Sequence, residues 1–295
     1  MNRLLRKALV VCLLGSFTNV SVSQQDTAPV LADIVISSGV EGGGYWGAGS
    51  RLQAVANGMG LTVQNQASIG SLANLRELMK EGSPVSLAFV QQDALQYYLD
   101  SKPGAVQAIE TLENIGRECV FIIADSKGDI ETVEDMQKAS RMQLGIKSPN
   151  SGIRVTFDYM ASLAPGLGDV TVNYGNAVDM MNGFAHPLTN IKRAVMVVHA
   201  PDAHSPEIDM VIANPDRFRF VEIRDERFTR KIASGEAIYH SMKVAPGAIE
   251  GAGSVQTICV QGLLVANKNK LAAQQREKVI ALIDNHWSQV RPDTE

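Results

Sequence analysis

Short apolar runs alternate along the first part of the chain with segments of helical periodicity. The predicted strands of this first block are 33–38, 61–66 and 85–90, and the predicted helices are 45–58, 71–81 and 92–100. We expect Ser71 to cap the second of these helices, because it precedes a leucine-rich face at helical spacing. Strands that alternate with helices of this length predict a parallel sheet with both faces covered.

The same order recurs in a second block. Its predicted strands are 143–147, 169–174, 194–198 and 219–223, and its predicted helices are 151–163, 176–184 and 206–213. Two long apolar segments, 118–124 and 255–266, lie outside the blocks, and a helix is predicted at 271–290. We expect the apolar segments to cross between the blocks. This predicts an α/β fold of two lobes, each a mostly parallel sheet flanked by helices, with two crossover strands as a hinge and a cleft between the lobes.

The first 23 residues have the layout of a secretory signal peptide. Basic residues (Arg3, Arg6 and Lys7) precede an apolar run, and small residues precede a cut near Ser23/Gln24. The run has about half of the ~20 apolar residues that span a bilayer, which favours cleavage over anchoring. We therefore expect a periplasmic protein. The predicted domains are a signal peptide at 1–23, lobe I at 24–122 plus 255–295, and lobe II at 123–254.

Composition narrows the function. The chain has 295 residues, 45% hydrophobic and 20% charged, with a net charge of -4. This is the composition of a globular protein, and without a basic excess no nucleic-acid partner is expected. The histidines and cysteines lack H-E-x-x-H and C-x-x-C spacing, so no metal is expected. No G-x-S-x-G elbow is present, and we predict no catalytic residues.

A glycine-rich motif, Gly42–Gly47, fits the G-x-G-x-x-G pattern of dinucleotide sites. Such a site needs an acid about 20 residues further on, and the end of the next predicted strand instead holds Asn65 and Gln66. No cofactor is therefore expected. The glycines still allow a ligand to approach the backbone at the start of a helix.

Two turns, one in each block, are candidate anion sites. In the first, Gly39, Gly43, Gly44 and Tyr45 precede or open a helix. Helix N-termini carry free N–H groups and a partial positive charge, so a pair of them facing across a cleft would hold a carboxylate.

The second turn, Ser148–Arg154, has the matching place in the second block, after a strand and before a helix. Ser151 is the expected N-cap, with Gly152 and Arg154 in the first helical turn. Arg154 could add a charge-assisted bond.

Three other residues follow predicted strands. Gln91 ends the third strand, where ligands of open parallel sheets bind. Asp93 is a ligand candidate as well, although capping of the next helix is the favoured interpretation. His199 follows the strand 194–198 and either reaches the cleft or lies in a loop. Cys119 and Cys259 both lie in apolar, strand-like runs, which leaves a disulfide and a pair of buried thiols open.

Several motifs resemble, in order and spacing, those of the TAXI family of solute receptors for TRAP transporters. They are Ser37–Tyr45, Gly70–Arg76, Leu87–Asp93, Pro149–Arg154, Tyr239–Pro246 and Thr257–Val265. The resemblance implies a class II periplasmic-binding fold that closes on a small organic anion such as glutamate, glutamine or a dicarboxylate. It also implies delivery of that anion to TRAP-type membrane permease subunits. One departure is Arg193, where the family has an aspartate, and it leaves the ligand's identity open.

Two alternatives remain beside a transport receptor. A protein of the same fold could be a ligand sensor that docks to a membrane signalling partner. An exported enzyme would need a base beside a nucleophile, and His199 with Ser151 is the pair that the sequence offers.

Overall fold

The computed structural model describes residues 34–185, 191–232, 235–248 and 254–291. The predicted signal peptide and its cut at Ser23/Gln24 lie outside these residues. Among the helices of the described ranges, none combines the length and apolar character that a membrane span requires.

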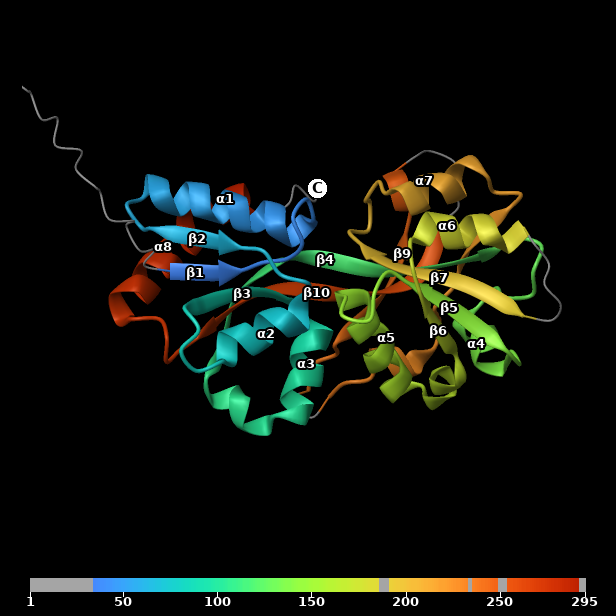
Figure 1. Ribbon diagram of the computed structural model, residues 1–295, viewed down its shortest axis with the longest axis horizontal. Coiled ribbons are helices and arrows are strands. Elements are labelled where there is room, and N and C mark those ends of the chain that lie inside the picture. Colours follow the sequence, from blue (N-terminus) through green and yellow to red (C-terminus); the bar gives the residue numbers. More distant parts are fainter. Residues whose placement is uncertain (1–33, 186–190, 233–234, 249–253, 292–295) are drawn as a thin grey trace, which may run out of the picture. The chain divides into compact units, whose positions relative to one another are not determined.

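Three strand–helix pairs build the first half (Figure 1). Its elements are β1 (Ile34–Ser37), α1 (Gly44–Gly58), β2 (Val63–Gln66), α2 (Ser71–Met79), β3 (Val85–Gln91), α3 (Gln92–Ser101) and the 3-10 turn η1 (Pro103–Gln107). Strand β1 pairs in parallel with both β2 and β3, as predicted. The predicted cap of α2 is wrong by one residue. Gly70 is the N-cap, and the Ser71 hydroxyl instead accepts a hydrogen bond from the backbone N–H of Gln91 at 3.1 Å.

Two long strands cross between the halves, as predicted. They are β4 (Ile109–Asp125) and β10 (Val255–Asn267), which pair antiparallel. Strand β4 begins well before the predicted Glu118. Residues 109–117 include buried, half-buried and exposed positions. They therefore lack the continuous apolar run by which 118–124 was predicted.

The second half adds strands and helices on the other side of β4. Its elements are α4 (Val133–Lys138), β5 (Met142–Ile146), α5 (Gly152–Leu163), η2 (Pro165–Asp169), β6 (Thr171–Tyr174), α6 (Ala177–Asn182), η3 (Gly183–Ala185), β7 (Lys192–His199), α7 (Pro206–Ala213), β8 (Phe218–Val221), η4 (Glu226–Thr229), β9 (Tyr239–Val244) and η5 (Pro246–Ala248). The chain then returns through β10 to α8 (Ala273–Val290). The element pattern did not predict α4 or β9.

The strand order is β2-β1-β3-β10-β4-β7-β5-β6, with β8 on β4 and β9 on β10. Within the second half, β5 pairs in parallel with β6 and β7, whereas β4 is antiparallel to β7 and β8. The sheet is therefore mixed, with parallel strands on each side of an antiparallel crossover pair. This arrangement confirms the predicted fold class.

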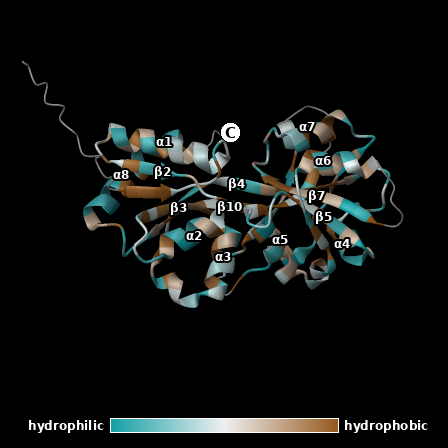
Figure 2. Ribbon diagram, viewed as in Figure 1, coloured by the Kyte–Doolittle hydropathy of each residue, from teal (hydrophilic) through white to brown (hydrophobic). Residues whose placement is uncertain are grey.

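The apolar core covers both faces of the sheet. In β3, Leu87 and Phe89 belong to one buried cluster and Ala88 and Val90 to another, as the alternation of side chains along a strand requires. Figure 2 shows the same concentration of hydrophobic residues in the central strands. Strands buried on both faces have continuous apolar sequences, which explains why the sequence predicted them well.

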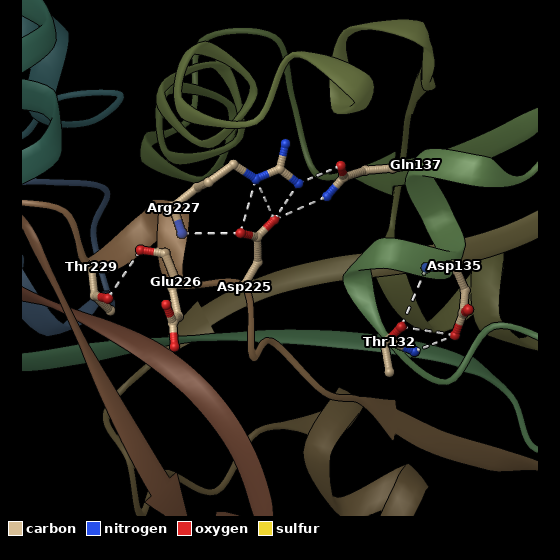
Figure 3. A network of polar contacts seen from close by, with 7 residues as sticks. All are labelled: Thr132, Asp135, Gln137, Asp225, Glu226, Arg227 and Thr229. Carbon is tan, nitrogen blue, oxygen red and sulfur yellow. Dashed lines mark hydrogen bonds and ion pairs between the residues drawn. The ribbon is translucent and has the colours of Figure 1, made fainter.

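A polar network joins α4 to η4 (Figure 3). Thr132 and Asp135 form a capping box at the start of α4. Asp225 accepts hydrogen bonds from Arg227 and from the Gln137 amide nitrogen, the latter at 3.4 Å. Together with the buried side chains of Ile223 and Phe228, these contacts hold the segment between β8 and β9.

A disulfide joins the two crossover strands. Cys119 and Cys259 lie directly opposite each other in the β4–β10 pairing and are bonded, with a sequence separation of 140. The choice between a disulfide and two thiols, which the sequence left open, is thus decided. The Thr257 hydroxyl also donates to the Val120 carbonyl oxygen across the same strand pair.

We expect reduction of this disulfide to lower the free energy of unfolding by roughly 2–5 kcal/mol, because the bond closes a long loop of the unfolded chain. Urea denaturation with and without reductant measures the change. The C119S/C259S double variant is the control, since it should unfold like the reduced protein and ignore the reductant. Equal midpoints for reduced and oxidised wild-type protein would contradict the prediction.

Candidate functional site

Asn74 holds the carboxyl ends of β1 and β3 together. Its side chain is fully buried, and its amide nitrogen donates to the carbonyl oxygens of Ser38 (2.5 Å) and Phe89 (2.7 Å). Its amide oxygen accepts from the Ser37 hydroxyl at 2.7 Å. The hydrogen bonds of Asn74 therefore fix the positions of the strand ends that the candidate residues follow. This role could not be predicted from the sequence, because Asn74 lies within the polar and apolar pattern of an ordinary helix.

The N-termini of α2 and α5 meet at one point. A Cβ atom placed on Gly70 would lie 3.1 Å from the Gly152 backbone nitrogen. Gly70 has a φ of 136°, which only glycine adopts readily, so this close approach depends on glycine at that position. Two helix N-termini, one from each half, thus bring their partial positive charges together.

The Gln91 side chain lies beside Gly152, where the N-termini of α2 and α5 meet. It is 5% exposed, and a Cβ atom on Gly152 would lie 2.4 Å from its Oε1 atom. Its Nε2 atom has a long hydrogen bond, 3.5 Å, to the Thr156 hydroxyl. The N-cap prediction for Ser151 is confirmed, since its hydroxyl accepts from the Arg154 backbone N–H at 3.3 Å. The structure therefore brings Gln91, Ser151 and Gly152 together.

The glycine turn after β1 makes its contacts within the first half. Gly43 is the N-cap of α1 and offers no side-chain cap. The Gly39 carbonyl oxygen accepts from the Ser68 backbone N–H at 2.9 Å, and a Cβ on Gly39 would lie 3.3 Å from the Tyr45 Cβ. A Cβ on Gly44 would meet open space.

Tyr45 extends from this turn onto the crossover strands. Its hydroxyl donates to Glu118 Oε2 at 2.9 Å, and its ring packs on Phe89 with 5.9 Å between centroids. A Cβ on Gly262 of β10 would lie 2.8 Å from the Tyr45 hydroxyl, so glycine is needed there. Sequence reasoning missed Glu118. The available signal was a single acid within the apolar run 118–124.

Asp93 bonds to the second half. It is fully buried, and its Oδ2 atom accepts from the Tyr239 hydroxyl at 2.9 Å. The same hydroxyl lies 3.3 Å from the Thr156 carbonyl oxygen. The favoured prediction that Asp93 caps the next helix is wrong, because Gln91 is the N-cap of α3. Asp93 lies one residue inside the helix and accepts from the Ala94 backbone N–H.

Burial controls the protonation of this group of residues. It raises the pKa of Asp93, against the lowering effect of hydrogen bonds from Thr156 and Tyr239. Burial, assisted by repulsion from Asp93, raises the pKa of Glu118 to about 7, although the Tyr45 hydrogen bond lowers it. The pKa values of Tyr45 and Tyr239 are raised well above the usual value, so both phenols are hydrogen-bond donors at neutral pH.

The guanidinium of Arg154 forms an ion pair within its own helix. Its guanidinium pairs with Asp158 at 2.7 Å and donates to the Tyr174 hydroxyl at 2.9 Å. A second arginine, Arg193, donates to the Gly183 carbonyl oxygen at 3.1 Å and lines a recess of about 240 Å³ in the second half.

His199 ends β7, with its Nε2 atom 3.9 Å from Glu207. Burial lowers its pKa, while the charge of Glu207 raises it. The Ser151 hydroxyl donates to the Ser148 carbonyl oxygen at 2.8 Å. Each member of the pair considered for an exported enzyme thus has a partner of its own. The described residues also contain no cluster of three His, Cys, Asp or Glu side chains placed to hold a metal ion.

No protein-family model matches the chain, and no curated protein matches it. Among solved structures, it is similar to lactococcal OpuAC complexed with glycine betaine (10% identity, 87% of this chain, 97% of that one, TM-score 0.45). It is also similar to the glycine/betaine/L-proline-binding protein ProX of Borrelia burgdorferi (10%, 88%, 97%, 0.46). A third is the Candida albicans CA3427 gene product, described as having the generic periplasmic binding protein fold (10%, 87%, 69%, 0.46). At these scores, no ligand or partner carries over to this chain.

The raised pKa of Glu118 predicts a stability cost that depends on pH. The folded protein retains a proton that the unfolded chain loses near the ordinary value of 4.5, so the free energy of unfolding falls as pH rises towards 7. We expect the E118Q variant to be more stable than wild type at pH 8, by up to about 3 kcal/mol, and equally stable at pH 4. Urea titrations at both pH values test this. A variant that is less stable at pH 8 would refute it.

Proposed function

We propose that this protein is a receptor that binds a small organic anion between its two halves. The observation that carries the proposal is the meeting of the α2 and α5 N-termini beside the buried carboxamide of Gln91. Free N–H groups and helix dipoles at such a point favour a carboxylate, and they lie at the carboxyl ends of β3 and β5, where open parallel sheets bind ligands.

The donors in this proposal are mainly backbone groups. The candidate backbone donors are the N–H groups of Gly44 and Gly152, whereas the Gly43 N–H already donates to the Val40 carbonyl oxygen at 3.0 Å. Gln91 adds a carboxamide, whereas the Tyr45 phenol donates its proton to Glu118. Arg154 is better suited to supporting the α5 N-terminus than to touching the ligand, because Asp158 neutralises its charge.

The crossover strands suit a protein that closes on its ligand. Strands β4 and β10 are the connections between the predicted lobes, 24–122 plus 255–295 and 123–254. A ligand that contacts both halves favours the closed form by its difference in affinity for the two forms. No bond is made or broken in this proposal.

The resemblance to TAXI receptors supports a TRAP-type permease as the partner and glutamate, glutamine or a dicarboxylate as the ligand. A periplasmic location accords with the predicted signal peptide and with the Cys119–Cys259 disulfide, since disulfides persist in oxidising compartments. His199 and Gly39 remain ligand candidates of the predicted cleft.

A thermal-shift screen of amino acids, dicarboxylates and neutral sugars tests the proposal. We expect an acid to stabilise the protein, by about 2.7 kcal/mol at a hundredfold excess over Kd. Stabilisation by neutral sugars alone would refute the anion site, and no stabilisation by any compound would argue against a small-solute receptor.

The G152A variant tests the site itself. Its Cβ would displace the Gln91 carboxamide from the α5 N-terminus, and we expect the affinity for the ligand found in the screen to fall about tenfold. The matched control is G168A in η2, where a Cβ meets nothing within 4 Å. Calorimetric titration compares the two variants. Equal affinities would show that Gly152 and Gln91 do not form the site.

A further inference from the structure

The second half contains a recess at the amino ends of its parallel strands. The recess has a volume of about 240 Å³ and is lined by residues of β5, β6 and β7, of α6 and of the turn after α6. Gln143 and Arg193 are each the second residue of their strand, and they are partners in the β5–β7 register. The α5 N-terminus instead follows the carboxyl end of β5. The recess is therefore separate from the candidate anion site at α2 and α5.

Arg193 brings a positive charge to the wall of this recess. The residue is half-buried, and its guanidinium donates one hydrogen bond, from Nη1 to the Gly183 carbonyl oxygen at 3.1 Å. No carboxylate of the described residues forms an ion pair with it. A guanidinium has five N–H groups in a rigid fork that matches a carboxylate. Arg193 therefore has donors left for an anion in the recess.

The other lining residues add a polar contact and an apolar surface. Asn173 Nδ2 donates to Gln143 Oε1 at 3.2 Å, which leaves the Gln143 Nε2 atom without an acceptor among the described residues. Met180 and Phe184 line the recess from α6 and the turn after it, and the Phe184 ring packs on Phe218 with 6.2 Å between centroids. An inorganic anion would leave this apolar surface in water, whereas an organic acid would cover it.

We propose that this recess binds a small organic monocarboxylate. The carboxylate pairs with Arg193 and the Gln143 amide, and the apolar part of the acid lies on Met180 and Phe184. The volume is far above the ~10–15 Å³ that holds one water molecule and below the ~300–1,000 Å³ of pockets for drug-sized ligands, so the acid is small. All the lining residues belong to the second half, so binding here does not require the two halves to close.

Calorimetric titration of wild-type protein tests the chemistry of the ligand. The probes are benzoate and hexanoate, their uncharged amides benzamide and hexanamide, and inorganic phosphate. We expect at least one of the two acids to bind about tenfold or more tightly than its amide and than phosphate, because the amide lacks the charge and phosphate lacks the apolar part. If neither acid exceeds its amide, or neither exceeds phosphate, the proposed ligand class is wrong.

Two variants test the place of binding. R193Q should weaken binding of the acid about tenfold or more, because it removes the guanidinium. The matched control is K192Q, which removes the same charge from the next residue of β7. The Lys192 side chain projects from the other face of the strand and pairs with Asp129, so K192Q should bind the acid as wild type does. Equal affinities of R193Q and wild type would overturn the inference.

The Met180 methyl group gives a readout that leaves the site unchanged. In wild-type protein labelled with ¹³C at the methionine methyl groups, we expect the Met180 signal, assigned by its loss in M180L, to shift as benzoate or hexanoate is added. A Met180 signal that does not move while the acid binds would overturn the inference. The G152A variant separates the two sites, since binding that falls in G152A but not in R193Q belongs to the α5 N-terminus. That result would refute the recess and support the proposed function.

Discussion

The antiparallel pairing of β4 with β10 is the constraint on which the rest of the structure depends. Both strands continue from the first half into the second, so every other strand is placed relative to them: β3 on β10, and β7 and β8 on β4. The disulfide between Cys119 and Cys259 fixes their register where the halves meet. Glu118 is the residue before Cys119, so the same pairing determines where the carboxylate of the candidate site lies.

The sequence predicted the fold well where residues are buried on both faces of a sheet. Apolar runs identified β1, β3, β7 and β10 to within a few residues, because most positions of these strands are apolar. It missed β9 and the first part of β4, whose exposed positions interrupt that pattern. The cap of α2 was misplaced because the serine hydroxyl bonds to β3, a contact made only after folding.

The candidate site was harder to predict than the fold, because its residues come together from distant positions. Gln91 and Ser151 were found by a local rule, since each follows a strand or opens a helix. Glu118 lies in a strand that looked purely structural, and Asp93 looked like a helix cap. Their partners, Tyr45 and Tyr239, are 73 and 146 residues away in sequence. No local pattern of residues records such contacts.

Asp93 and Glu118 are two acids whose pKa values are raised by burial. A carboxylate whose pKa is raised weakens the folded state at neutral pH, and a glutamine of the same shape would avoid this loss. Structural ion pairs also perturb pKa values, but here burial raises the pKa of both acids, the charge of Asp93 adds to the shift of Glu118, and no ion pair with a cationic side chain of the described residues offsets either shift.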